Sequence, residues 1–92
     1  MYIFSVTAKT KEAIDGFAKD AEAPFIVYID FKDLIGAEQL ARLFVMKEGF
    51  YDVVIEKRKQ LPKGKVLQLK RKDKQIQEAL KTGYAIQLFD EH

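Results

Sequence analysis

The chain has 92 residues, of which 48% are hydrophobic and 33% are charged, and its formal net charge is +2. This balance predicts one small globular domain over residues 1–92 and argues against a disordered chain. Cysteine is absent, which excludes disulfides, thiolate metal sites and thiol nucleophiles.

The first third of the chain predicts a strand, a helix and a second strand. Residues 2–8 alternate in the manner of a strand. Thr10 is then expected to cap a helix that ends before Pro24. Residues 25–29 form a continuous apolar run, which is typical of a strand covered on both faces. The apolar stripe expected on the helix consists of Ile14, Phe17, Ala18 and Ala21.

The middle of the chain predicts a second helix and then a β-hairpin. The helix is expected to begin at Asp33 or Gly36 and to end near Gly49. Residues 51–59 follow as a strand. The tetrapeptide Leu-Pro-Lys-Gly that follows them suits a β-turn, because proline presets φ at the second turn position. A further strand over residues 65–70 would complete a hairpin over about 51–70.

The end of the chain predicts a third helix and a last strand. Asp73 is expected to cap the helix and Gly83 to close it, before residues 84–89 alternate as a strand. The element order is then β-α-β-α-β-β-α-β, with about five strands and three helices. It predicts an α+β domain, α/β-like in its first half, whose mixed sheet has parallel early strands.

Positive charge is concentrated in residues 55–74, which hold nine basic and two acidic residues. The rest of the chain holds seven basic and twelve acidic residues. A surface of one sign attracts polyanions and acidic proteins. We therefore expect RNA or DNA to bind electrostatically along the predicted hairpin. The candidate nucleic-acid-binding residues are Lys57, Arg58, Lys59, Lys63, Lys65, Lys70, Arg71, Lys72 and Lys74.

The same charge pattern leaves other interpretations open. Lysines on an exposed hairpin also protect sheet edges from aggregation, and only two of the nine basic residues are arginines, which limits bidentate recognition. The alternative function is a small regulator or inhibitor that binds another protein, or a second copy as a homodimer. Its small size would suit an accessory protein of a phage or mobile element.

Groups that could perform catalysis are scarce. The histidine is the last residue, His92, and the serine, Ser5, lies in a predicted strand without a base, which argues against acyl-transfer triads and zinc sites built from histidine and cysteine. No glycine-rich phosphate loop occurs, so no cofactor is expected. The third alternative, a metal-dependent nuclease, would depend on Asp30, Asp33 and Asp52. We expect a non-enzymatic protein.

The sequence also bears on location. No apolar stretch approaches the ~20 residues that span a bilayer, and the first residues lack the pattern of a signal peptide. We expect a cytoplasmic protein without a membrane partner, in the host cytoplasm if its origin is viral.

Overall fold

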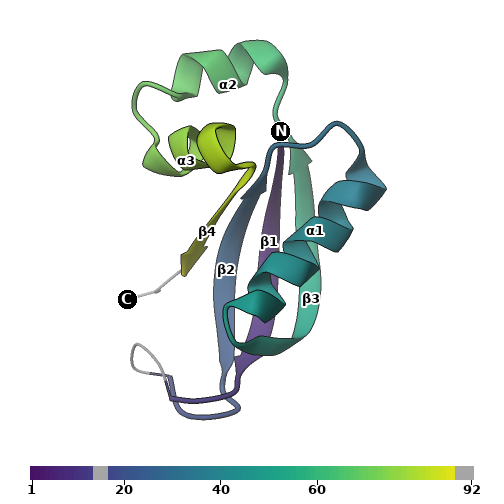
Figure 1. Cartoon of the computed structure of the whole chain (residues 1–92), viewed down its shortest axis with the longest axis vertical. Coiled ribbons are helices and arrows are strands. Elements are labelled where there is room, and N and C mark those ends of the chain that lie inside the picture. The colour runs from purple at the N-terminus through teal and green to yellow at the C-terminus, as the bar shows by residue number, and fades with distance from the viewer. Residues whose placement is uncertain (14–16, 89–92) are drawn as a thin grey trace.

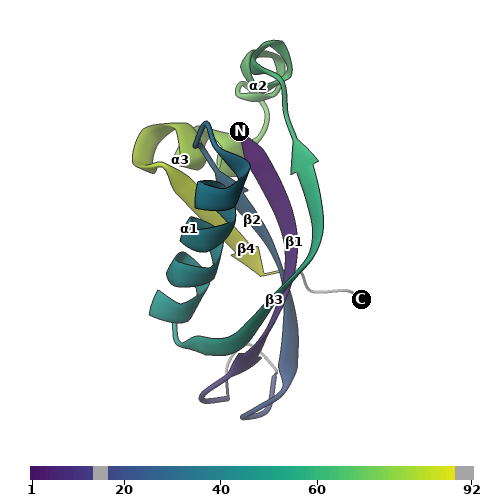
Figure 2. The same cartoon turned by 90° about the vertical axis from the view of Figure 1, so that its right-hand side faces the viewer.

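The computed structural model describes residues 1–13 and 17–88, which form one antiparallel sheet with helices on both faces (Figures 1 and 2). Within these residues the sheet has four strands, in the order β3-β1-β2-β4. The α+β class is as predicted, but the mixed sheet of about five strands is not. The elements are β1 (Tyr2–Thr10), β2 (Glu22–Ile29), α1 (Leu34–Lys47), β3 (Phe50–Gln60), α2 (Lys63–Leu69), α3 (Lys74–Thr82) and β4 (Tyr84–Leu88).

β1 and β2 form a long antiparallel hairpin, with Tyr2 opposite Ile29 at one end and Lys9 opposite Glu22 at the other. The parallel pairing predicted for the early strands is therefore wrong. The helix predicted between them is wrong too, because the described residues of the connection are not helical. Antiparallel neighbours need only a loop, whereas parallel neighbours need a long crossover.

Thr10 closes this loop and does not cap a helix. Its backbone N–H donates to the carbonyl of Ala21 at 3.1 Å, and its hydroxyl donates to the carbonyl of Ala18 at 2.8 Å. From the same loop, Phe17 packs against the sheet core. Ile14, which belonged to the expected helical stripe, lies outside the described residues.

The helix α1 covers one face of the sheet (Figure 2). It begins as predicted, because the Asp33 carboxylate accepts a hydrogen bond from the Gly36 N–H at 2.8 Å. It ends before Gly49, whose φ of 97° is in the left-handed region. The core on this face comprises Tyr2, Phe4, Val6, Ala8, Ala23, Phe25, Val27, Ile29, Ala37, Ala41, Val45, Phe50 and Ile55.

The hairpin predicted over residues 51–70 is wrong in its second half. β3 forms the first arm, but a helix begins after Pro62 in place of the second arm. The Val66 N–H donates to the carbonyl of Pro62 at 3.0 Å. Val66 and Leu69 turn toward the core, while Leu67 is 57% exposed. The apolar residues here are spaced by both two and three positions, so either period fits the sequence. The helical period prevails because it buries Val66 and Leu69 together.

The helices α2 and α3 pack on the opposite face, and Figure 1 shows them at one end of the sheet. α3 begins at Asp73 as predicted. The Asp73 carboxylate accepts hydrogen bonds from the N–H groups of Gln75 at 2.9 Å and Ile76 at 3.2 Å. Gly83 closes the helix with a φ of 96°, and β4 then pairs with β2. The second core cluster comprises Tyr28, Leu61, Val66, Ile76, Ala79 and Ala85.

The rest of this second face carries polar side chains, and we call it the open face. Paired residues of neighbouring strands project from the same side of a sheet, which puts Thr7 and Lys57 on the open face together with Gln87 of β4. None of the helices in residues 1–13 and 17–88 combines the length and apolar character that crossing a membrane requires.

Candidate functional site

The nine candidate nucleic-acid-binding residues lie in three places. Lys57 and Lys59 lie on the edge strand β3 and project from the face away from α1. Arg58 projects from the α1 face. The other six lie on α2, on α3 and in the turn between these helices. We call this stretch, residues 63–74, the basic segment. These six are Lys63, Lys65, Lys70, Arg71, Lys72 and Lys74.

Lys57 and Lys59 border the basic segment from the sheet. They lie opposite Ser5 and Ile3 of β1, and Ile3 packs against the second core cluster beneath α2 and α3. The positive surface of the helices therefore continues onto the edge of the open face. Because β3 is an edge strand, the two lysines also hinder pairing with another strand.

Arg58 is separated from this surface by the alternation of the strand. It lies opposite Phe4, on the side of α1, and its Nε donates to the Glu38 carboxylate in an ion pair. Glu38 compensates the guanidinium charge, so a phosphate would have to displace the carboxylate to bind there. Arg58 thus does not belong with the lysines that flank it in the sequence.

Hydrogen bonds hold the turn between α2 and α3. The N–H groups of Lys72 and Asp73 both donate to the carbonyl of Leu69 at 3.0 Å. The Gln77 side-chain amide donates to the carbonyl of Lys70 at 2.6 Å. Leu69 itself packs against the second core cluster. The exposed cations of the turn are therefore presented by a backbone that is fixed to the core.

No ion pair compensates the cations of the basic segment within the described residues. The two ion pairs among the described residues lie outside the segment and join Lys9 to Asp52 at 3.4 Å and Arg58 to Glu38. Neither α2 nor α3 has an acidic residue in its first turn. The one carboxylate of the segment, Asp73, already accepts two N–H groups. Six like charges thus share a short stretch, and a bound polyanion would relieve their repulsion.

The carboxylates of the nuclease hypothesis are not brought together. Asp30 follows β2 and Asp33 caps α1, whereas Asp52 lies near the start of β3, paired with Lys9. β2 and β3 run in the same direction on either side of β1, so the end of one lies far from the start of the other (Figure 1). Residues 1–13 and 17–88 hold no cluster of three acidic or histidine side chains suited to a metal ion.

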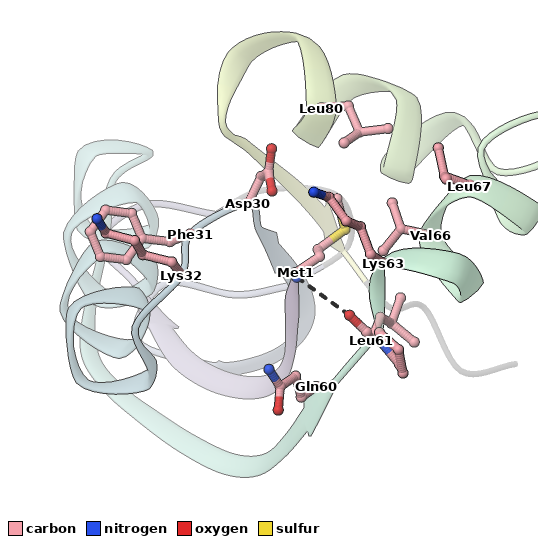
Figure 3. A pocket seen from close by; sticks show the side chains of 11 residues that line it. Met1, Asp30, Phe31, Lys32, Gln60, Leu61, Lys63, Val66, Leu67 and Leu80 are labelled. Atoms are coloured by element: carbon pink, nitrogen blue, oxygen red, sulfur yellow. Dashed lines mark hydrogen bonds between the residues drawn. The ribbon is translucent and has the colours of Figure 1, made fainter.

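An apolar groove with a volume of about 630 Å³ opens beside the basic segment, between the chain after β2 and the helices α2 and α3. Figure 3 shows Phe31 on one side and Leu67 and Leu80 on the other. These three side chains are 40%, 57% and 41% exposed. Asp30 adds one negative charge to the groove, and Lys32 and Lys63 add two positive charges. Sequence reasoning missed this groove because it assigned Leu67 to a strand over residues 65–70 and not to the helix α2.

Two tyrosines, Tyr28 and Tyr51, have pKa values above the ordinary value of a phenol. Burial, and then the nearby charge of Asp73, raise the pKa of Tyr28 above its ordinary value. On the exposed start of β3, the hydrogen bond that the Tyr51 hydroxyl donates to Asp20 raises the pKa of Tyr51. Both hydroxyls therefore stay protonated at neutral pH and act as neutral hydrogen-bonding groups.

The basic segment and the apolar groove are adjacent surfaces of opposite chemical character. Lys63 belongs to the segment and also lines the groove. Comparison of the chain with models of protein families, with curated proteins and with solved structures finds no match.

Proposed function

We propose that the protein binds nucleic acid electrostatically, through the basic segment and the adjoining Lys57 and Lys59. The observation that carries this proposal is the unpaired positive charge of residues 63–74, six cations without an ion pair among the described residues. A nucleic-acid backbone offers closely spaced phosphates, and each lysine contact releases a condensed counterion. In this role the protein acts by binding and performs no reaction.

The chemistry of the cations indicates how the nucleic acid is held. Five of the six are lysines and only Arg71 has a guanidinium fork. Lysine acts as a flexible point charge, whereas arginine recognises phosphates and guanine edges in a bidentate manner. Contacts from this segment therefore position the backbone and carry little sequence information. The affinity should fall steeply as the salt concentration rises.

Charge reversal in the turn tests the proposal. A triple variant, Lys70→Glu with Arg71→Glu and Lys72→Glu, is titrated against fluorescent mixed-sequence RNA and DNA at about 50 and about 200 mM salt. We expect it to lose at least about tenfold in affinity, because three phosphate contacts become repulsive. The matched control reverses three exposed lysines outside the segment, Lys11, Lys19 and Lys47, and so has the same net charge.

Two results would contradict nucleic-acid binding. One is that the wild-type protein binds neither RNA nor DNA at low salt. The other is that both triple variants lose affinity equally, since net charge alone would then govern binding and the basic segment would have no special role.

The apolar groove favours a second candidate, a small regulator or inhibitor that binds another protein. With Lys32 and Lys63 against Asp30, the largely apolar groove carries more positive than negative charge. It therefore complements a partner segment that combines apolar and acidic side chains. Replacing Leu67 by serine should then weaken binding of such a partner without changing the affinity for nucleic acid. Light scattering of the purified protein tests the remaining possibility, a homodimer. The absence of cysteine suits the reducing cytoplasm for either function.

A further inference from the structure

A polar cleft lies under the turn between α2 and α3, next to β4. Its volume is about 480 Å³, which is within the range of about 300–1,000 Å³ found for small-molecule sites. The turn supplies cations, β4 supplies an amide, and the sheet supplies an aromatic floor. The lining residues are Tyr28, Leu69, Lys72, Asp73, Lys74, Gln75 and Gln87.

Tyr28 is the feature of the cleft that points to a ligand. Its side chain belongs to the second core cluster and the residue is only 9% exposed. The hydroxyl makes no hydrogen bond with any described residue, and yet no polar side-chain atom in that part of the chain is both buried and unpartnered. Because Tyr28 lines the cleft, we place its hydroxyl at the cleft surface. Buried tyrosines usually satisfy this group within the protein, so a hydroxyl that lies at the floor of a cleft and bonds to no described residue is suited to a ligand.

The other polar groups of the cleft are of two kinds. Lys72 and Lys74 supply positive charge at its rim. The side-chain amides of Gln75 and Gln87 have no hydrogen-bond partner among residues 1–13 and 17–88 and offer donors and acceptors together. Amides pair with the edges of nucleobases, and ammonium groups pair with phosphates.

Asp73 restricts where an anion fits in the cleft. Its carboxylate accepts the N–H groups of Gln75 and Ile76 but keeps its negative charge. A phosphate is therefore expected on the side of Lys72 and Lys74, away from this carboxylate. The apolar side chain of Leu69 leaves part of the wall suitable for the face of a base.

We infer that this cleft binds one nucleotide of a single-stranded nucleic acid, with its base against Tyr28, Gln75 and Gln87. The inference rests on the proposed function and narrows it, because the bases of a duplex are stacked and paired and cannot enter such a cleft. The basic segment supplies affinity for the backbone. The cleft then supplies a preference for single strands and for particular bases.

The test compares single-stranded homopolymers of each base, about 12 nucleotides long and thus within single-strand site sizes, with a duplex of the same length. Affinities are measured by fluorescence anisotropy for the wild type, Tyr28→Phe and Gln87→Ala. The control Gln39→Ala removes an exposed amide on α1, outside the cleft. We expect the wild type to prefer some homopolymers and to prefer single strands over the duplex.

Tyr28→Phe removes one oxygen and Gln87→Ala changes an exposed residue, so both variants should fold, which circular dichroism verifies. Each should weaken binding of the preferred homopolymer by about 3- to 10-fold, as expected for one lost hydrogen bond. Gln39→Ala should bind like the wild type. Binding that is salt-dependent but insensitive to both cleft variants, or without preference among homopolymers, overturns the nucleotide site and leaves the electrostatic function standing. No binding of any oligonucleotide overturns the proposed function itself.

Discussion

The two faces of the sheet differ in how completely helices cover them. One face lies under the 14-residue helix α1 and its core cluster has 13 buried residues in the described chain. The other lies under the short helices α2 and α3 at one end only, and its cluster has six buried residues there. Lysines and other polar side chains, together with the half-exposed Val54, occupy the rest of that face. The first face thus supplies most of the hydrophobic stabilisation, and the second presents the surfaces suited to binding.

The largest expected effect is on the face under α1. Phe4 is fully buried there, at 0% exposure, on the central strand β1. Phe4→Ala should lower the free energy of unfolding by about 3–5 kcal/mol, because it leaves a cavity that the surrounding strands cannot close. This is a large share of the ~5–15 kcal/mol that holds a typical domain together. Urea denaturation followed by circular dichroism measures the loss.

A smaller effect is expected from the matching change in the second cluster. Ile76 is 1% exposed on α3, and Ile76→Ala should cost about 2–4 kcal/mol. Hydrogen exchange should show protection lost first in α2 and α3, because the core cluster beneath them has six buried residues against 13 beneath α1. The contradicting outcome is that all amides lose protection together in Phe4→Ala and in Ile76→Ala. The two faces would then unfold as one cooperative unit and would not differ in local stability.

The elements that the sequence predicted correctly are those specified by local signals. Asp33 and Asp73 cap their helices through N–H groups two or three residues away, and Gly83 ends α3 through its own backbone conformation. Such interactions depend on neighbours in the chain. The two errors, at residues 10–13 with 17–21 and at residues 65–70, depend on distant partners. Whether β2 returns directly to β1, and whether Val66 has a buried site, is decided by residues far away in sequence.

The candidate site shows the same division. The concentration of charge over residues 63–74 can be read from the sequence alone, because the six cations of the basic segment are neighbours in the chain. The side of the sheet on which Arg58 lies depends on its register with β1, and its partner Glu38 comes from α1. The apolar groove and the polar cleft require α2 and α3 to fold over Tyr28, which no local pattern indicates.

The capping residue of α3 should have an effect of intermediate size. Asp73→Ala removes the acceptor of two N–H groups and should lower the free energy of unfolding by about 1 kcal/mol. A helix of nine residues depends on its cap more than a long helix does. Asp73→Asn keeps a capping side chain and should cost less in the same urea titration. Equal losses in the two variants would mean that the charge of Asp73, and not its capping role, stabilises α3.

The smallest expected effect comes from the ionisation of Tyr28 on the second face. Burial and the charge of Asp73 raise the pKa of this phenol in the folded protein above its value in the unfolded chain. The folded state therefore holds the proton more tightly. The corresponding contribution to stability is complete below about pH 10 and is lost as the pH rises through the folded-state pKa.

Tyr28→Phe cannot ionise and isolates this contribution. The urea midpoint of the wild type should fall more than that of Tyr28→Phe between about pH 9 and about pH 11. Asp73→Asn should reduce the extra fall without abolishing it, because burial still opposes the phenolate after the negative charge is gone. Parallel pH curves for the wild type and Tyr28→Phe would mean that the phenolate is well solvated through the polar cleft. The second face would then be open to water even where α3 covers it.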